Sequence, residues 1–275
     1  MIDFLAHRFS TLSREEIAIR MQHGGVLDAK GLSVCAEHRY QPHMKLYYYR
    51  RIPAEVPIPF EAAVLFQDDF VVAVDKPHFL PVTPGGRYLQ ETLLVRLKRK
   101  LGIDTLAPMH RIDRETAGLV LFTVQPSTRG QYQELFAQKL VTKRYLATAN
   151  VRECLKFPMI YRSRLVESEH FMRMREADGD ANAETQIELL EANQLRARYR
   201  LVPTTGKKHQ LRVHMAALGI PILNDQIYPD HLSKREIEDC DYTKPLQLLA
   251  DCISFTDPIS GEERRFESRF QLNSL

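Results

Sequence analysis

Strand-length segments fill most of the chain from residue 62 onward, and only three helix-length segments interrupt them. The clearest strand is residues 70–74, a continuous apolar run that suits a strand buried on both faces. It stops at the Asp-Lys-Pro of residues 75–77, because proline cannot continue a β ladder. The other predicted strands are residues 118–124, 141–150, 185–189, 195–201, 246–255 and 263–270.

The predicted helices are too few to alternate with these strands. They are residues 90–101, 126–140 and 209–218, the last of them closed by Gly219. Residues 161–183 are polar and mixed in charge, so we expect a loop or an irregular hairpin there. Because strands and helices do not alternate regularly, we predict an α+β fold with a mixed, mainly antiparallel central sheet and flanking helices.

The first 52 residues are interpreted as a separate small domain. Ser13, followed three residues later by Glu16, is a capping box that begins a short helix, and another short helix precedes it. Residues 26–31 and 45–49 then have the composition of two strands around a turn. The predicted layout is two helices followed by a hairpin.

A cluster of prolines marks the end of this small domain. The prolines are Pro53, Pro57 and Pro59. They indicate an extended linker over residues 53–61. Residues 62–275 then form a second, larger domain, which is long enough to bury a sizeable core.

Composition sets only broad limits on function. The net charge of +3 and the pI of about 8.6 give a mild preference for polyanions. The four cysteines lie far apart without a CxxC pair, so their spacing predicts neither a disulfide framework nor a zinc site. The chain opens with no signal peptide and has no apolar run of about 18 residues. We therefore expect a reduced, soluble, cytoplasmic protein, and nothing here requires more than a monomer.

The first segment that suggests chemistry is residues 109–119, just before a predicted buried strand. Its ionisable residues are His110, Arg111, Asp113, Arg114 and Glu115. Asp113 should stay ionised, because the positive charges of Arg111 and Arg114 flank it. An ionised carboxylate can act as a nucleophile or a base. A polar loop with salt bridges explains the same residues equally well.

The second segment is residues 204–214. Gly206 permits a tight backbone turn, and the helix that follows offers free N–H groups to a phosphate, with Lys207 and Lys208 beside them. Arg212, one turn into the helix, can reach a carboxylate. A capped surface helix is the alternative. His209 and His214 are five residues apart, which is not the spacing of a helical metal pair, so we expect no metal.

The third segment is residues 141–147, a predicted strand in which Lys143 and Arg144 precede Tyr145. Two cations beside an aromatic ring can hold a phosphate and stack a base. An ordinary strand with a half-buried tyrosine fits the same pattern.

In order and spacing, these segments resemble the RluA family of RNA pseudouridine synthases. The similar motifs are Val-Asp-Lys-Pro at 74–77, Leu-Pro-Val at 80–82, His-Arg-Ile-Asp at 110–113, Thr-Ala-Gly-Leu at 116–119, Lys-x-Tyr-x-Ala at 143–147, Ala-x-Thr at 183–185, and the Thr-Gly-Lys-Lys-His-Gln-Leu-Arg-Val-His of 205–214. The resemblance covers roughly residues 62–270. Collinear motifs of this number are more than chance agreement explains.

The resemblance implies a pseudouridine synthase fold and the isomerisation of specific uridines in structured RNA, either ribosomal or transfer RNA, without a cofactor or a metal. It implies that Asp113 attacks ribose C1′ or abstracts the C2′ proton, and that Arg212 pairs with Asp113 and keeps it ionised. Tyr145 is expected to stack on the flipped uracil and to assist proton removal at C5. The expected RNA contacts are Arg111, His110, Lys76, Lys143, Lys207, Lys208 and His209.

The first 52 residues are similar to the helix-helix-hairpin RNA-binding module first seen in a small-subunit ribosomal protein. The similar residues are Phe4-Leu5, Ser13-Arg14, Gly-Gly-Val-Leu at 24–27 and Lys30-Gly31. His23 and Asp28 reduce its usual basic character. We expect a degenerate RNA-binding-like module.

Two other functions stay open on the residues alone. A non-catalytic RNA-binding protein would use the basic clusters, but would not need the Asp113 and Arg212 pair. A hydrolase acting on nucleosides or glycosides typically needs two carboxylates around one bond. Glu115 is near Asp113 in the sequence, but it need not face the same site.

Overall fold

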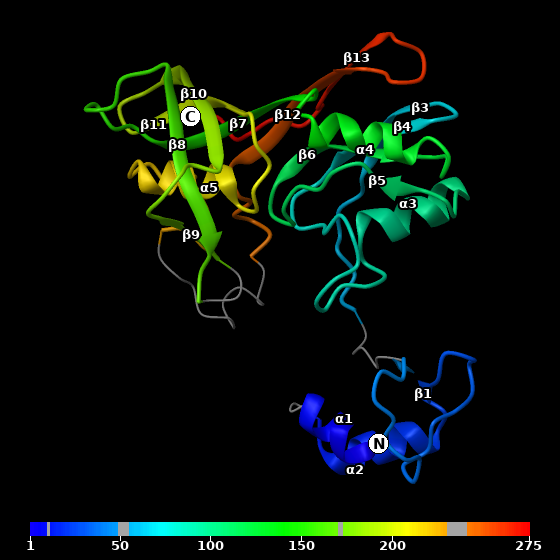
Figure 1. The fold of residues 1–275 in the computed structure, drawn as a ribbon. Coiled ribbons are helices and arrows are strands. Elements are labelled where there is room, and N and C mark those ends of the chain that lie inside the picture. The colour runs from blue at the N-terminus through cyan, green and yellow to red at the C-terminus, as the bar shows by residue number, and fades with distance from the viewer. Residues whose placement is uncertain (10–11, 49–54, 170–172, 230–240) are drawn as a thin grey trace. The chain divides into compact units, whose positions relative to one another are not determined.

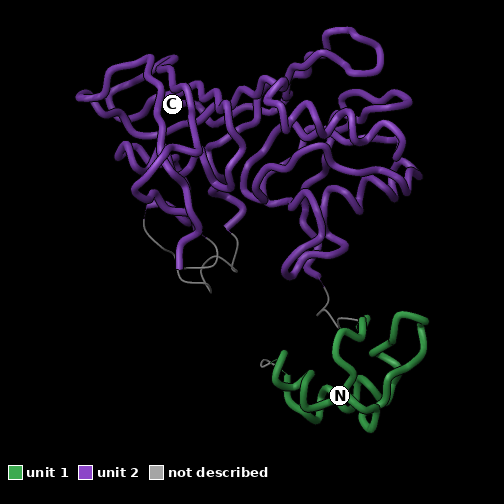
Figure 2. The backbone as a smooth tube through the Cα atoms, in the orientation of Figure 1, with its two compact units in different colours: residues 1–54 green, residues 55–275 purple. Residues whose placement is uncertain are grey.

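The computed structural model describes residues 1–9, 12–48, 55–169, 173–229 and 241–275. The chain divides into two compact units, residues 1–54 and 55–275, which Figure 2 distinguishes by colour. Each unit has a hydrophobic core of its own. None of the helices in these described ranges has the length and apolar character needed to cross a membrane.

The first unit contains two helices and a short antiparallel pair of strands. Its elements are α1 (Ile2–Arg8), α2 (Arg14–Gln22), β1 (Val26–Leu27) and β2 (Tyr47–Tyr48). The predicted capping box is confirmed, since Ser13 accepts the N–H of Glu16 and the Glu16 side chain accepts the N–H of Ser13. Tyr49, the last residue of the second predicted strand, lies outside the described residues.

The second unit is built on one large sheet. Its strands are β3 (Ala63–Gln67), β4 (Val71–Lys76), β5 (Ala107–Pro108), β6 (Ala117–Thr123), β7 (Thr142–Asn150), β8 (Met159–Glu167), β9 (Met174–Ala177), β10 (Ala183–Ala192), β11 (Arg196–Pro203), β12 (Leu248–Thr256) and β13 (Glu263–Glu267). Their order is β3-β4-β6-β12-β7-β11-β10-β8-β9, with β5 beside β6 and β13 beside β12. Within the described part of the chain, only β6 and β12 pair in parallel, so the predicted mixed and mainly antiparallel sheet is confirmed.

Within the ranges that the structure describes, three helices flank this sheet. They are α3 (Leu93–Leu101), α4 (Arg129–Ala137) and α5 (Gln210–Ala217). In Figure 1, α3 and α4 lie beside the part of the sheet formed by β3 to β6, and α5 lies beside β8 to β11. The predicted helix over residues 126–140 is shorter than expected and begins at Arg129.

Strand β4 shows why residues 70–74 are apolar without alternation. Its six residues are all buried. Val72 and Val74 pack in one cluster with Leu93 of α3, whereas Val71 and Ala73 pack in another. The second cluster includes Tyr132 of α4. Because both faces of the strand are covered by helices, its positions from Val71 to Val74 are all apolar.

Of the loop or irregular hairpin predicted over residues 161–183, the hairpin is the form present, because β8 and β9 pair as antiparallel neighbours. Strands β8 and β9 occupy most of this stretch and β10 begins at Ala183, while residues 170–172 lie outside the described residues. The alternation along β8 is hard to recognise, because its half-buried side carries Tyr161 and Ser163 instead of aliphatic side chains. Pairing with β10, about twenty residues later, defines the strand.

Residues 55–61 of the predicted linker belong to the second unit and pack on the rest of it. The carboxylate of Glu55 accepts the N–H groups of Leu89, Gln90 and Glu91 at 2.7 to 2.9 Å. Ile58 is 4% exposed and joins the core cluster below α3. This stretch is extended, as predicted for a proline-rich segment, but it is anchored instead of free.

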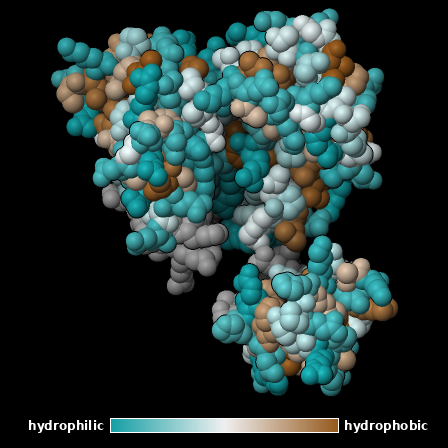
Figure 3. Space-filling view, in the orientation of Figure 1, coloured by the Kyte–Doolittle hydropathy of each residue, from teal (hydrophilic) through white to brown (hydrophobic). Residues whose placement is uncertain are grey.

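The two parts of the sheet meet where β6 pairs with β12. At that point Gly118 has a φ of +108°, and a Cβ there would lie 2.2 Å from the carbonyl oxygen of Ala250. Only glycine therefore permits this close parallel approach. Figure 3 shows the surface of this unit hollowed between the two parts.

Candidate active site

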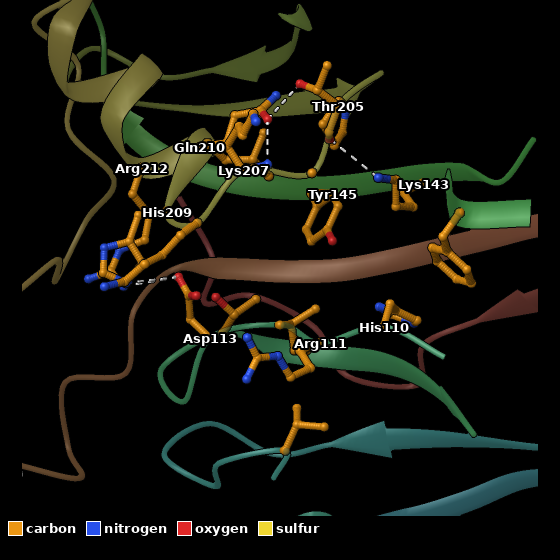
Figure 4. A pocket seen from close by; sticks show the side chains of 18 of the residues that line it. His110, Arg111, Asp113, Lys143, Tyr145, Thr205, Lys207, His209, Gln210 and Arg212 are labelled. Atoms are coloured by element: carbon orange, nitrogen blue, oxygen red, sulfur yellow. Dashed lines mark hydrogen bonds and ion pairs between the residues drawn. The ribbon is translucent and has the colours of Figure 1, made fainter. Parts of the chain in front are cut away.

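A cavity of about 900 Å³ opens in the second unit where the loop before β6, strand β7 and the start of α5 meet. Figure 4 shows side chains from these three places facing one another. All but one of the predicted site residues line it: His110, Arg111, Asp113, Lys143, Tyr145, Lys207, Lys208, His209 and Arg212. Segments separated by about a hundred residues thus form one site.

Asp113 lies in the loop between β5 and β6, with its side chain 25% exposed. Nη1 of Arg212 donates a hydrogen bond to its Oδ2 at 3.2 Å. The Arg212 side chain is only 1% exposed, so the carboxylate is held from the protein side and remains open to the cavity. The predicted pairing of these two residues is present.

Arg212 is held in turn by a residue that the sequence did not suggest. Its Nε and Nη2 donate to the two carboxylate oxygens of Asp225 at 2.8 and 2.7 Å. Both side chains are 1% exposed, and this bidentate geometry is the strongest that a guanidinium makes with a carboxylate. Asp225 leaves only Nη1 of Arg212 to face Asp113. The pKa of Arg212 is raised because these bonds and charges outweigh its burial.

Glu115 faces the same cluster. Its carboxylate lies 3.7 Å from Arg212 and accepts a hydrogen bond from Nε of Arg114 at 2.8 Å. Burial raises the pKa of Glu115, but the opposing effect of the Arg114 and Arg212 charges is larger, and the pKa falls to about 2. Glu115 is therefore ionised at neutral pH and cannot donate a proton there.

Tyr145 lies on β7 between its neighbours β11 and β12, and its ring lines the cavity. Burial raises the pKa of the Tyr145 phenol, and the charge of Asp113 raises it further. The phenol therefore keeps its proton at neutral pH and offers a flat aromatic face with a hydrogen-bond donor.

His110 is neutral instead of cationic. Its Nε2 accepts the N–H of Leu121 at 3.2 Å, and its ring stacks on Phe136 at 4.9 Å. Burial lowers the pKa of His110 to about 3, and the nearby Lys143 lowers it as well. The ring can touch a ligand in the cavity, but it supplies no positive charge to RNA.

The predicted phosphate contact of Lys76 is wrong. Lys76 is 0% exposed and does not line the cavity. Its Nζ donates to the carbonyl oxygens of Pro77 at 2.9 Å and Arg114 at 3.1 Å. Through Arg114, Lys76 anchors the loop that carries Asp113. Burial lowers its pKa to about 7, against the attraction of Glu115 and Asp113.

The remaining predicted cations lie around the cavity. Arg111, Lys207 and Lys208 are exposed, and Nζ of Lys143 donates to the carbonyl of Thr205 at 3.4 Å. The side chain of Gln210 accepts the backbone N–H of Lys207. This N–H is one of the groups at the start of the helix that were expected to bind a phosphate, and it already has a partner within the protein. These side chains still surround the Asp113 carboxylate with positive charge, an arrangement suited to a polyanion.

Comparison with known proteins agrees with this geometry. The model of the RNA pseudouridylate synthase family matches residues 70–217. An uncharacterized RNA pseudouridine synthase of Synechocystis is 26% identical over 83% of this chain and 79% of its own length. The dual-specificity RNA pseudouridine synthase RluA of Haemophilus influenzae is 29% identical over 75% of this chain and 92% of its own.

A solved structure supports the fold. Human RNA pseudouridylate synthase domain containing 4 is 27% identical, with a TM-score of 0.56 over 76% of this chain and 88% of that chain. Some relatives are longer, and this chain spans 61% of one and 36% of another. The chain belongs to the RNA pseudouridylate synthase family, whose members are isomerases acting on RNA, and its resemblance to the RluA group is confirmed.

Proposed function

We propose that this chain isomerises specific uridines to pseudouridine in a structured ribosomal or transfer RNA, with Asp113 as the catalytic carboxylate. The observation that carries the proposal is the Asp113 side chain, open to a cavity surrounded by cations and held by buried Arg212. The proposed reaction breaks the bond from ribose C1′ to N1, turns the base and joins C1′ to C5. The proton on C5 leaves to solvent and N1 takes up one proton, so the reaction is an isomerisation that needs no cofactor.

The target base must leave the RNA stack to reach Asp113, which costs a few kcal/mol. In the cavity, Asp113 attacks C1′ or abstracts the C2′ proton, and both steps need the ionised carboxylate that Arg212 holds. Tyr145 stacks on the uracil. Its raised pKa argues against direct proton removal by the phenolate. Arg111, exposed at the cavity, is positioned to fill the space that the base vacates.

The ionisation of Glu115 weighs against hydrolysis. A glycosidase needs one carboxylic acid that is protonated near neutral pH beside an ionised partner. The pKa of Glu115 is about 2, because the charges of Arg114 and Arg212 outweigh its burial. Glu115 therefore serves as an ionic partner of these arginines.

We further propose residues 1–52 as an RNA-binding-like module, residues 53–61 as the connection and residues 62–275 as the catalytic domain of a cytoplasmic monomer. The first unit has its own core around Leu5, Ile17 and Met21, which supports an independently organised module. Its exposed aromatic residues Tyr47 and Tyr48 offer stacking surfaces to RNA.

A tritium assay separates the three functions. The purified chain is incubated with unmodified ribosomal and transfer RNA that carries tritium on uracil C5. Isomerisation releases tritium to water and leaves the RNA chain intact. A hydrolase releases free uracil instead, and a protein that only binds RNA releases neither. Release of tritium without free uracil is expected, and either other outcome contradicts the proposal.

A further inference from the structure

One turn, residues 225–228, contacts the two side chains that face Asp113, which are Arg212 and His209. The Oδ1 atom of Asp225 accepts the N–H groups of Ile227 at 2.8 Å and Tyr228 at 3.1 Å, which closes the turn. The same Oδ1 atom accepts the hydrogen bond from Nη2 of Arg212. The position of Tyr228 is therefore fixed relative to Arg212.

Tyr228 reaches from this turn to His209. Its hydroxyl oxygen accepts the N–H of Met174 at 2.8 Å and lies 2.9 Å from Nδ1 of His209. Because Met174 already supplies a donor, the hydroxyl proton of Tyr228 is available to point at Nδ1 of His209. Burial raises the pKa of Tyr228, so the hydroxyl keeps this proton at neutral pH.

His209 has a backbone conformation that side chains rarely adopt. Its φ is 55°, in the left-handed region, immediately before α5. Residues other than glycine keep this conformation only where their surroundings impose it, and such residues gather at functional sites. The His209 side chain is 9% exposed, and its Nε2 lies 3.8 Å from Oδ2 of Asp113.

Burial, more than the surrounding charges, keeps the His209 ring neutral. Burial lowers its pKa, and the charges of Arg212 and Lys208 lower it further. The carboxylates of Asp113 and Glu115 oppose this effect without reversing it. A neutral imidazole has one ring proton, so the partner of Nδ1 decides whether Nε2 carries it.

We propose that Tyr228 is a positioning residue that acts through His209: its hydroxyl donates a hydrogen bond to Nδ1 and thereby places the ring proton on Nε2, facing Asp113. The 3.8 Å from Nε2 to Oδ2 is too long for a direct hydrogen bond. An oxygen of the target ribose placed beside the line joining the two atoms, at about 2.8 Å from each, would contact both. This inference rests on the proposed role of Asp113.

The tautomer can be observed without turnover. In full-length protein labelled with ¹⁵N-histidine at pH 7 and free of RNA, ¹⁵N NMR distinguishes a ring proton on Nε2 from one on Nδ1. The His209→Gln variant assigns the signal. We expect the Nε2–H form, and a shift toward a mixture of the two forms in Tyr228→Phe. A proton on Nδ1 in the unmodified protein overturns the proposal, as does an unchanged tautomer in Tyr228→Phe.

Kinetics provide the second test, with Tyr199→Phe as the matched control, because the Tyr199 hydroxyl donates to Asn150 in the core. We expect Tyr228→Phe to lower kcat about tenfold with KM nearly unchanged, and the control to change neither kcat nor KM. In the His209→Gln background, Tyr228→Phe should have no further effect on kcat.

An equal loss of kcat with and without His209 overturns the proposal, because Tyr228 would then act independently of His209. A chain that makes no pseudouridine at all refutes the proposed function, but the tautomer measurement still decides the role of Tyr228. The failures of the two ideas are therefore distinguishable.

Discussion

Arg212 sets the position of Asp113, the proposed catalytic carboxylate, and its geometry gives a first prediction. Arg212→Lys keeps the charge, but an ammonium cannot bond to both Asp113 and Asp225 as the planar guanidinium does. We expect kcat to fall by about 100-fold or more, with a smaller change in RNA affinity. Single-turnover tritium release measures the rate.

Arg264 provides a matched control for this substitution. It also bridges two carboxylates, those of Asp68 at 2.9 Å and Asp257 at 3.1 Å, but it does not line the cavity. Arg264→Lys should therefore reduce stability while turnover stays near that of the unmodified protein. Equal losses of turnover in the two variants would show that Arg212 is only structural.

The buried Lys76 predicts how stability depends on pH. In the folded protein its pKa is lowered to about 7, whereas its ordinary value is 10.5. Between these values the unfolded chain binds more protons, so this group makes the free energy of unfolding rise with pH. The contribution is at most about 1.4 kcal/mol per pH unit.

The variant Lys76→Met removes this contribution. Urea unfolding at pH 7, 8 and 9 should show that the unmodified protein gains stability with pH relative to Lys76→Met. Lys100→Met, at an exposed position of α3, serves as the control and should keep the pH dependence of the unmodified protein. A parallel pH dependence for the protein and Lys76→Met would mean that Lys76 keeps its proton when folded.

Among the elements, the parallel pair of β6 and β12 joins the two parts of the sheet and depends on Gly118. A methyl group at this position would meet the backbone of Ala250 at 2.2 Å. We expect Gly118→Ala to lower the free energy of unfolding by about 3 kcal/mol or more. Gly130→Ala, in helix α4 with no atom within 4 Å, should instead gain about 0.5–1 kcal/mol. Denaturant unfolding measures both, and an equal effect would contradict this account of the β6–β12 contact.

Elements with a strong local pattern could be predicted from the sequence. Residues 70–74 are apolar throughout because helices cover both faces of β4, and Ser13 with Glu16 forms the expected capping box. The extent of strand β8 could not be predicted, because its half-buried positions include Tyr161 and Ser163. Its identity depends on pairing with a distant strand, which no local pattern encodes.

The residues of the candidate site were likewise predictable only where a local motif contains them. Asp113 and Arg212 lie in segments whose residues match known motifs, so their pairing could be predicted. Asp225 and Tyr228 were missed, because their roles depend on contacts with Arg212 and His209 that only the fold creates. Lys76 was misassigned, because burial on β4 cannot be distinguished from exposure by charge alone.

For the molecule as a whole, the distribution of cations predicts how RNA binding depends on salt. Lys207 and Lys208 are exposed at the cavity, and Lys30 and Lys45 are exposed on the first unit. Replacing the first pair with alanine should reduce the slope of log affinity against log salt by about 0.7 per lost phosphate contact. Filter binding at several salt concentrations measures the slope.

Replacing Lys30 and Lys45 with alanine tests RNA binding by the amino-terminal module separately. An equal reduction of the slope supports RNA binding by residues 1–52, and an unchanged slope excludes these two lysines from the RNA interface. An unchanged slope for Lys207 and Lys208 would place the RNA elsewhere than the cavity.

The central claim is that Asp113 performs the chemistry in this cavity. The direct measurement is pseudouridine formation by Asp113→Asn, compared with Asp104→Asn, which makes the same change at an exposed carboxylate outside the cavity. Tritium release from C5-labelled RNA should be undetectable for Asp113→Asn, with RNA affinity within a few-fold, and normal for Asp104→Asn. Continued tritium release by Asp113→Asn would contradict the assignment of Asp113 as the catalytic carboxylate.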